Sequence, residues 1–199
     1  MPIRLAVLGD SFVEGRGDPH PGGGYRGWVP RLAESLRLPR GTVRNTGTHG
    51  ATTQDVVDSQ LPGALVHKAP LIGVIVGVND LVSDYDPVRF ERNLTVLFGA
   101  LGGADTTVVT ATYPDIPANL PVPDAFRDLL RSRFTEANTT LRRVTAAAGA
   151  LCLDIARAPE WRDRALWSAD GLHPSPLGHR RFAESVLDLV DRATGLTAA

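Results

Sequence analysis

Five short aliphatic runs alternate with longer amphipathic stretches along this chain, and the alternation constrains the fold more than any other feature. The runs lie at residues 3–9, 42–47, 71–77, 106–112 and 150–155. The third and fourth runs are apolar without a clean two-residue period, as expected for strands that are covered on both faces. Strand, helix, strand repeated in this way predicts a parallel sheet with helices packed on both sides.

Apolar residues at helical spacing mark the helices expected between these strands. The patterns are Trp28, Leu32 and Leu36; Val57, Leu61 and Leu65; Phe90, Leu94, Leu97 and Leu101; Phe126, Leu130, Phe134, Leu141 and Val144; and Phe182, Val186, Leu189 and Val190. Thr53, Asp86, Asp124 and Ser175 are expected to begin four of them, because short polar side chains cap the free N–H groups of a first turn.

Composition indicates one globular domain, which we expect to span residues 1–199. The chain has a net charge of -1 with 22% charged residues, so we expect neither a nucleic-acid partner nor an anionic membrane surface. No apolar run is long enough to cross a bilayer, and no secretory signal is evident, so we expect a cytoplasmic protein. Cys152 is the single cysteine, which leaves no partner for an intrachain disulfide. Nothing in the sequence specifies an oligomeric state.

Polar residues directly after strands are the candidates for a functional site, because parallel sheets bind ligands at the carboxyl ends of their strands. Three clusters follow strands directly, and a fourth lies beyond a short connecting segment after the fifth strand. They are Gly9-Asp10-Ser11, then "GTHG" with Gly47, His49 and Gly50, then "GVND" with Gly77, Asn79 and Asp80, and finally "SADGLHP" with Asp170 and His173. We expect all four to meet at one edge of the sheet.

These clusters contain the groups that acyl transfer requires. A serine hydroxyl such as Ser11 becomes nucleophilic when a base removes its proton, and His173 is a base near neutral pH. Asp170, three residues earlier, is close enough to orient that imidazole. A backbone N–H beside a glycine after the second strand, the Asn79 amide and the N–H of Ser11 are possible donors to an oxyanion.

The ordered set of these motifs resembles the SGNH hydrolases, the superfamily that includes the GDSL-type esterases and lipases. The resemblance covers the whole chain and is carried by "GDS", Gly50, "GVND" and "DGLHP". It implies a flavodoxin-like three-layer α/β/α sandwich with a five-stranded parallel sheet. It also implies a catalytic triad of Ser11, His173 and Asp170, and an oxyanion hole of Ser11, Gly50 and Asn79. Asp10 and Asp80 take supporting roles by the same resemblance, and no metal or organic cofactor is required.

Two positions depart from the usual pattern of that superfamily. Phe12 follows "GDS" where many members have leucine or isoleucine, and we expect it to pack against the core. His49 directly precedes the oxyanion glycine, Gly50. A solvated loop histidine and a histidine that touches the substrate both remain open for His49.

Other chemistries fit the sequence less well. The five histidines are His20, His49, His67, His173 and His179, and they show no zinc-binding spacing. We expect His179 on a helix surface. A pair of carboxylates, Asp10 and Asp80, would suit acid–base catalysis, but the resemblance assigns both to support. Gly22-Gly23-Gly24 lacks the lysine of a phosphate loop, which leaves nucleotide or flavin binding as a weaker alternative.

The expected reaction is cleavage of a small acyl or acetyl ester through an acyl-serine intermediate. A thioesterase or an acyltransferase on the same site is the alternative. The loops at 15–27 and 113–124 are expected to frame the pocket, and Tyr25, Tyr113, Phe126 and Trp167 are each candidates for its wall or for the core. No long apolar segment suggests a lid, which disfavours a lipase that acts at an oil interface.

Overall fold

A parallel sheet forms the centre of the computed structural model, which describes residues 2, 4–39 and 41–195. The described residues form five strands in the order β2-β1-β3-β4-β5, paired in parallel throughout. Their bounds are β1 Leu5–Gly9, β2 Val43–Asn45, β3 Leu71–Ile75, β4 Thr107–Ala111 and β5 Leu151–Leu153. All five predicted strands are present, each somewhat shorter than its aliphatic run. The predicted parallel α/β fold is confirmed.

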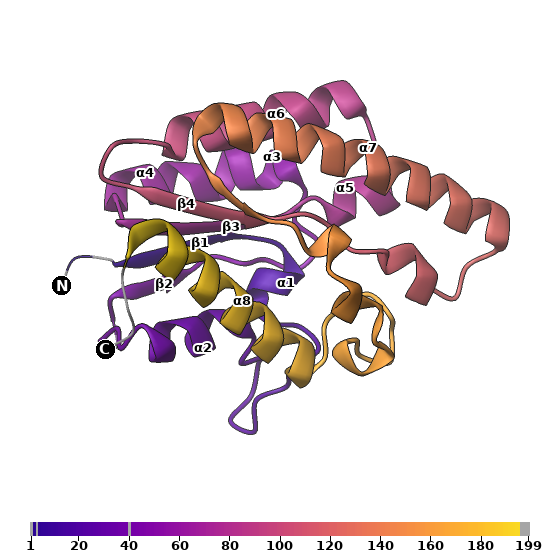
Figure 1. Ribbon diagram of the computed structural model, residues 1–199, viewed down its shortest axis with the longest axis horizontal. Coiled ribbons are helices and arrows are strands. Elements are labelled where there is room, and N and C mark those ends of the chain that lie inside the picture. The colour runs from indigo at the N-terminus through magenta and orange to yellow at the C-terminus, as the bar shows by residue number, and fades with distance from the viewer. Residues whose placement is uncertain (1, 3, 40, 196–199) are drawn as a thin grey trace.

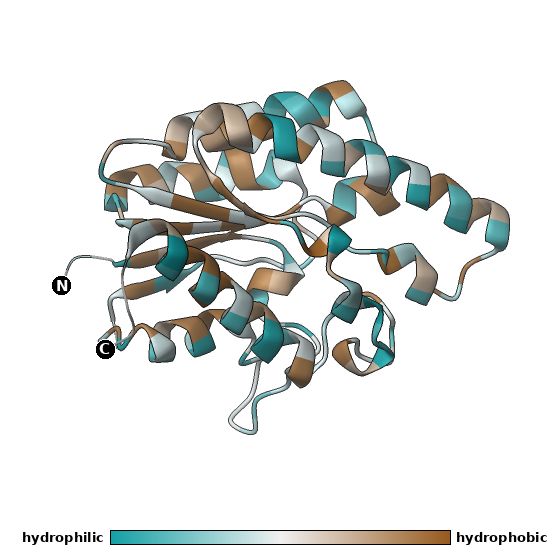
Figure 2. Cartoon of the chain, viewed as in Figure 1, coloured by the Kyte–Doolittle hydropathy of each residue, from teal (hydrophilic) through white to brown (hydrophobic). Residues whose placement is uncertain are grey.

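Helices cover both faces of the sheet and complete three layers (Figure 1). On one face α2 (Trp28–Ser35) packs against α8 (Pro176–Thr194), and on the other α6 (Pro87–Leu101) packs against α7 (Asp124–Ala148). The shorter elements are α1 (Ser11–Glu14), α3 (Thr53–Asp55), α4 (Leu61–His67), α5 (Val78–Val82), a π-helical turn η1 (Val56–Gln60), and the 3₁₀ turns η2 (Ile116–Asn119), η3 (Ile155–Arg157), η4 (Pro159–Arg162) and η5 (Arg164–Leu166). Figure 2 shows the hydrophobic side of the long helices turned toward the sheet, as their apolar spacing predicts.

The segment after β2 departs from its predicted helical pattern. Thr52, not Thr53, caps the helix, and a capping box with Asp55 satisfies its first N–H groups. The π turn that follows inserts an extra residue, so Val56 and Leu61 face the core while Leu65 is 41% exposed. Of the expected stripe, Leu61 is buried and Val57 packs against the core, whereas the prediction for Leu65 was wrong, because a four-residue spacing assumes a regular α-helix.

The other helix starts lie close to the predicted positions. The Asp86 carboxylate accepts hydrogen bonds from the N–H groups of Val88 and Arg89, and the Ser175 hydroxyl accepts one from Gly178. Helix α7 begins at Asp124 as expected, although its cap position is Pro123. Among the described helices, none is long and apolar enough to span a membrane.

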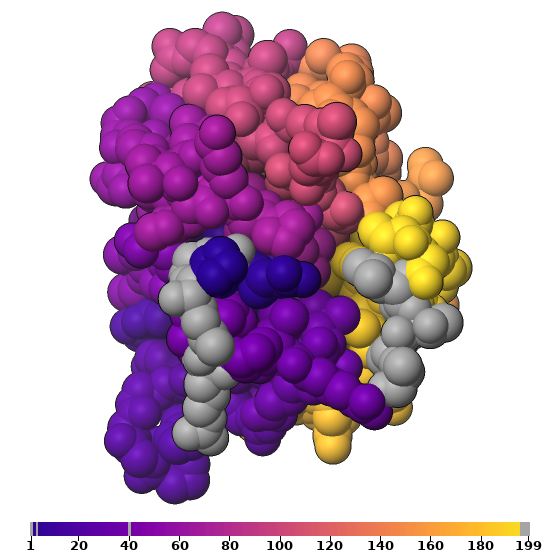
Figure 3. Space-filling view, turned by 90° about the vertical axis from the view of Figure 1, so that its left-hand side faces the viewer, coloured from indigo at the N-terminus to yellow at the C-terminus, as the bar shows by residue number. Residues whose placement is uncertain are grey.

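The connections place the site at a point where the order of the strands changes direction. From β1 the chain runs outward to β2 and then returns to the other side of β1 to form β3. The helices after β1 and β3 therefore leave the sheet on opposite faces, which opens a space at the carboxyl ends of these central strands. The opposite end of the molecule, seen in Figure 3, carries the beginning of the chain in indigo and the end of α8 in yellow.

Candidate active site

Ser11 is the first residue of α1, immediately after the central strand β1. Gly9 adopts φ +153°, and a Cβ at that position would lie 1.8 Å from the carbonyl oxygen of Ile75 on β3. Only glycine allows this close approach of the two strand ends. Asp10 then caps α1 by accepting a 2.9 Å hydrogen bond from the N–H of Phe12. The sequence "GDS" thus places Ser11 at the edge of the sheet, 8% exposed.

Asp170, His173 and Ser11 form one continuous chain of hydrogen bonds, although 162 residues separate Ser11 from His173. The Ser11 Oγ lies 2.9 Å from His173 Nε2, and His173 Nδ1 lies 2.7 Å from Asp170 Oδ2. A carboxylate beside Nδ1 favours the tautomer with its proton there, which leaves Nε2 to accept from the serine hydroxyl.

Asp170 is ionised in this arrangement. Its partial burial by itself would raise the pKa, but hydrogen bonds donated by the His173 ring, the His173 N–H, the Ser168 hydroxyl and the Leu172 N–H outweigh that effect. The net result is a pKa well below the usual value of an aspartate. Asp170 therefore presents a negative charge to Nδ1 across the neutral pH range.

The turn that carries Asp170 and His173 lies outside the sheet and is closed by backbone contacts. Trp167 and Pro174 form an antiparallel bridge, and the Ser168 N–H donates to the His173 carbonyl at 2.8 Å. The Ser175 N–H donates to the Leu166 carbonyl at 2.8 Å, just before Ser175 caps α8. The turn is thus held between the 3₁₀ turns before it and the start of α8.

Gly50 lies on the loop after β2, and Asn79 is the second residue of α5, which follows β3, and lines the same pocket as Ser11. The Asn79 Nδ2 donates to the carbonyl of Ala51 at 2.9 Å, which ties α5 to the loop after β2. That hydrogen bond uses one of two amide protons and fixes the direction of the other. Gly50 adopts φ +77°, a left-handed conformation that favours glycine, and no atom lies within 4 Å of where its Cβ would be.

Two buried carboxylates lie beneath these loops. Burial, with a smaller contribution from the charge of Asp80, raises the pKa of Asp10 to about 7. Asp80 accepts hydrogen bonds from the N–H of Thr53 at 2.9 Å and from its hydroxyl at 2.6 Å, and burial raises its pKa too. Both carboxylates contact the backbone of site loops, which is consistent with the supporting roles expected for them.

Gln60 is a contact of the nucleophile strand that sequence reasoning missed. Its Oε1 accepts a hydrogen bond from the Gly9 N–H at 2.8 Å, and its Nε2 donates to the Gly9 carbonyl at 2.9 Å. The Thr46 hydroxyl also donates to Oε1, at 3.1 Å. In the sequence, Gln60 stands out only as a polar residue directly before the apolar Leu61. No sequence pattern predicts the π turn that directs its side chain inward.

His179 is fully buried, which corrects its expected place on a helix surface. Its Nε2 donates to the carbonyl of Arg16 at 2.7 Å, and its ring packs 5.2 Å from that of Phe12. Its Nδ1 has no hydrogen-bond partner among the described residues. Burial lowers the pKa of His179 to about 4, so the ring is neutral. The spacing of His179 from Phe182 and Val186 already placed it on the apolar stripe of α8.

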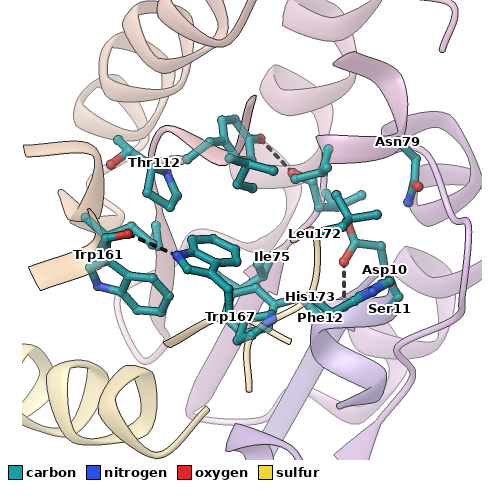
Figure 4. A pocket seen from close by; sticks show the side chains of 18 residues that line it. Asp10, Ser11, Phe12, Ile75, Asn79, Thr112, Trp161, Trp167, Leu172 and His173 are labelled. Atoms are coloured by element: carbon teal, nitrogen blue, oxygen red, sulfur yellow. Dashed lines mark hydrogen bonds between the residues drawn. The ribbon is translucent and has the colours of Figure 1, made fainter. Parts of the chain in front are cut away.

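The remaining aromatic candidates divide between the pocket and the surface. Tyr113 and Trp167 line a pocket that begins at Ser11 and His173 (Figure 4), whereas Tyr25 and Phe126 are 38% and 39% exposed and lie elsewhere. Phe12 packs on Trp28 and Phe182, as expected, and also lines the pocket. Of the two loops expected to frame the pocket, residues 113–124 contribute to its wall and residues 15–27 do not.

His49 and the glycine cluster both lie on the surface. His49 is exposed, with its ring 6.4 Å from that of His173. Gly22, Gly23 and Gly24 lie in an exposed turn closed by a bridge between Pro19 and Tyr25. In the part of the chain that the structure describes, no group of three histidine, cysteine or acidic side chains is placed to hold a metal ion.

Fold and site together define a three-layer α/β/α protein in which a serine, a histidine and an aspartate are joined by hydrogen bonds. A model of the GDSL-like lipase/acylhydrolase family matches residues 7–181, and the chain belongs to this family. It is accordingly a carboxylic ester hydrolase that acts on small-molecule substrates. The acetylxylan esterase of Geobacillus stearothermophilus is 22% identical over 92% of both chains.

Solved structures share the fold. The lipase/acylhydrolase of Enterococcus faecalis superposes with a TM-score of 0.72 at 22% identity, covering 97% of each chain. A family 3 carbohydrate esterase of Clostridium thermocellum superposes with a TM-score of 0.69 at 19% identity over 100% of both chains. At these identities the likeness establishes the three-layer sandwich and leaves the substrate to the residues of this chain.

Proposed function

We propose that this chain hydrolyses carboxylic esters through an acyl-enzyme on Ser11, with His173 as general base and acid and Asp170 as the carboxylate that orients it. The observation that carries the proposal is the unbroken hydrogen-bond chain from Asp170 Oδ2 through both ring nitrogens of His173 to Ser11 Oγ. Distances of 2.7 and 2.9 Å are those at which proton transfer needs no rearrangement.

The first half of the reaction forms the acyl-enzyme. His173 Nε2 removes the hydroxyl proton as Ser11 Oγ attacks the ester carbonyl carbon, and the imidazolium that results is stabilised by Asp170. The Ser11 N–H, the Gly50 N–H and the free Asn79 amide proton donate to the oxyanion of the tetrahedral intermediate. His173 then protonates the leaving alcohol, and the C–O bond to it breaks.

The second half returns the enzyme to its resting state. Water takes the place of the alcohol, His173 Nε2 removes one of its protons, and the hydroxide oxygen attacks the acyl carbon. Collapse of the second tetrahedral intermediate breaks the bond to Ser11 Oγ, which recovers its proton from His173 and releases the carboxylic acid. Every proton moves between Ser11, His173, the substrate and water.

A single substitution tests this proposal. Ser11→Ala should lower the turnover of p-nitrophenyl acetate and p-nitrophenyl butyrate by at least about 10³-fold, because the nucleophile is removed. Ser35→Ala, at the exposed last residue of α2, is the matched control and should turn over both esters like the wild type. Turnover by Ser11→Ala at the wild-type rate would refute the proposal.

A further inference from the structure

The pocket beside Ser11 is enclosed and almost entirely apolar on the side away from Gly50. It extends from Ser11 and His173 past the ends of β3 and β4, where Ala111 and Ile116 form its wall, to the indoles of Trp161 and Trp167 (Figure 4). These two tryptophans are 4% and 6% exposed and pack edge to face with their centroids 5.7 Å apart. Gly50 does not line this pocket and is exposed.

The polar groups in the depth of the pocket already have protein partners. The Tyr113 hydroxyl donates to the carbonyl of Val76 at 2.7 Å, and the Trp167 indole N–H donates to the carbonyl of Trp161 at 3.1 Å. The Thr112 hydroxyl donates to Asp154 at 2.8 Å. A polar substrate group placed here would lose its hydrogen bonds to water without replacement, whereas an alkyl group would bury apolar surface.

The exchange of alcohol for water between the two halves of the reaction indicates that this pocket holds the acyl group. The alcohol must leave and water must enter before the second step, so the alcohol side has to be open to solvent. The side near Gly50 and His49 is exposed, while the apolar pocket ends at Trp161. An acyl chain can stay in the enclosed pocket while the leaving group and water exchange on the open side.

The cavity is small. The centre of a water-sized group can occupy about 40 Å³ of it. That space suits a short acyl chain and is too small for a long one. The indoles of Trp161 and Trp167 are locked together and against Phe182, and they fix the far end.

We propose that the apolar pocket ending at Trp161 and Trp167 holds the acyl chain and selects short-chain acyl esters over long-chain ones. This inference rests on the proposed acyl-serine mechanism and adds the class of acyl group to it. Ala111 and Ile116 are specificity-determining residues in this account, because both line the middle of the pocket. Sugar or other polar alcohol parts lie on the exposed side, near His49.

Two ester series test the assignment. In the first, p-nitrophenyl acetate, propionate, butyrate, hexanoate and octanoate vary the acyl chain at a constant leaving group. We expect kcat/KM to peak at acetate, propionate or butyrate and to fall at least about tenfold by octanoate, since each methylene that a pocket cannot accept costs about tenfold or more. In the second, ethyl, butyl and hexyl acetate vary the alcohol, and kcat/KM should change less than about threefold.

Two substitutions change the size of the pocket in opposite directions, and the acyl-chain series measures the effect of each. Ile116→Ala lengthens the space and should move the optimum toward hexanoate, whereas Ala111→Val narrows it and should lower the ratio of butyrate to acetate turnover about tenfold or more. Because Ile116 is 5% exposed and its truncation could unfold the chain, Val78→Ala, at a partly buried residue on the same pocket, is the second enlarging variant. Val66→Ala, at a residue 79% exposed on α4, is the control and should keep the wild-type profile.

The outcomes separate this inference from the proposed function. Hydrolysis that depends on Ser11 but is fastest with octanoate, or that follows the alcohol series instead of the acyl series, overturns the pocket assignment and leaves the mechanism in place. An optimum that none of the enlarging or narrowing variants moves also overturns it. Hydrolysis that persists in Ser11→Ala refutes the mechanism, and the acyl assignment falls with it.

Discussion

Ser11 and Asn79 follow central strands of the sheet, whereas Asp170 and His173 lie in a turn that has left the sheet. The nucleophile side rests on buried groups, with Asp10 and Gln60 3% and 7% exposed. On the base side the Asp170 side chain is 52% exposed and is held by hydrogen bonds within its own turn. Substitutions in the turn of Asp170 and His173 should therefore affect the rate more than the stability. Substitutions of the buried groups around Ser11 should affect the stability as well.

The largest effect is expected from Asp170→Asn. An amide beside His173 Nδ1 donates where the carboxylate accepts, so the imidazole takes the wrong tautomer and kcat should fall about 10³- to 10⁴-fold. The free energy of unfolding from urea titration should fall by no more than about 1–2 kcal/mol, because the amide oxygen of Asn can still accept from the N–H groups of Leu172 and His173. Asp128→Asn, with a side chain 75% exposed on α7, is the matched control. A variant that loses stability in proportion to its activity would remove the contrast between the two sides.

Asn79→Ala is expected to be next in size. Loss of one donor to the oxyanion lowers kcat by about 10²- to 10³-fold, with KM changing little, since the donor acts on the transition state. Asn79 also joins α5 to the loop after β2 through Ala51, so we expect a loss of stability of about 1 kcal/mol in the same variant. A change confined to KM in steady-state kinetics would show that Asn79 binds the ground state instead.

The pH dependence of stability should reveal the buried His179. Its folded pKa of about 4 lies below the value of 6.5 expected for the unfolded chain, so its neutral form stabilises the fold fully above pH 6.5. That contribution, about 3 kcal/mol, is lost as the pH falls from 6.5 through 4. Asp10 acts in the opposite direction, because its raised pKa of about 7 makes the folded state hold a proton that the unfolded chain releases above pH 4.

The variant His179→Gln separates the contribution of His179 to the pH dependence of stability from that of Asp10. Gln has an amide donor for the Arg16 carbonyl and does not titrate. Urea unfolding from pH 4 to 7 should show a wild-type advantage that grows with pH by up to about 3 kcal/mol. The groups that face His179, namely Asp18, Arg31 and His173, are common to both proteins. A difference between the two proteins that stays constant with pH would contradict the assignment.

The smallest effect is expected from Gln60→Leu. Removing the amide leaves the N–H and the carbonyl of Gly9 buried without partners, which costs about 1–3 kcal/mol of stability. Because Gly9 sets the position of Ser11, kcat should also fall, by about tenfold. Gln54→Ala, on the less buried preceding turn, is the control. Lower stability with an unchanged kcat would limit Gln60 to a structural role.

The features that the sequence could predict are those that depend on local patterns of residues. Each strand ends in a recognisable break, and a parallel sheet must bring such breaks to one edge, so Ser11 and Asn79 could be named in advance. His173 lies well beyond β5 and was named from the "DGLHP" motif. The closing glycine, Gly9, and the helix cap at Asp86 follow from similarly local rules. These features depend on a few neighbouring residues.

The groups that hold the site depend on packing that no local pattern records. The π turn that aims Gln60 at Gly9 breaks the four-residue period on which helix prediction relies. Trp161 lies in a run of 3₁₀ turns without periodicity, so its place at the end of the pocket could not be predicted. The prediction of a surface position for His179 was wrong for a different reason, because its spacing from Phe182 and Val186 on α8 could have indicated burial.

Covalent labelling of Ser11 tests the central claim most directly. Diethyl p-nitrophenyl phosphate should react with the wild-type protein so that Ser11 Oγ bonds to phosphorus and p-nitrophenolate leaves. Mass spectrometry of a tryptic digest should find one diethylphosphoryl group on the peptide of residues 5–16, in which Ser11 is the only serine. Asp170→Asn should be labelled far more slowly. A label on any other residue, or none on this peptide, would contradict an acyl-serine mechanism at Ser11.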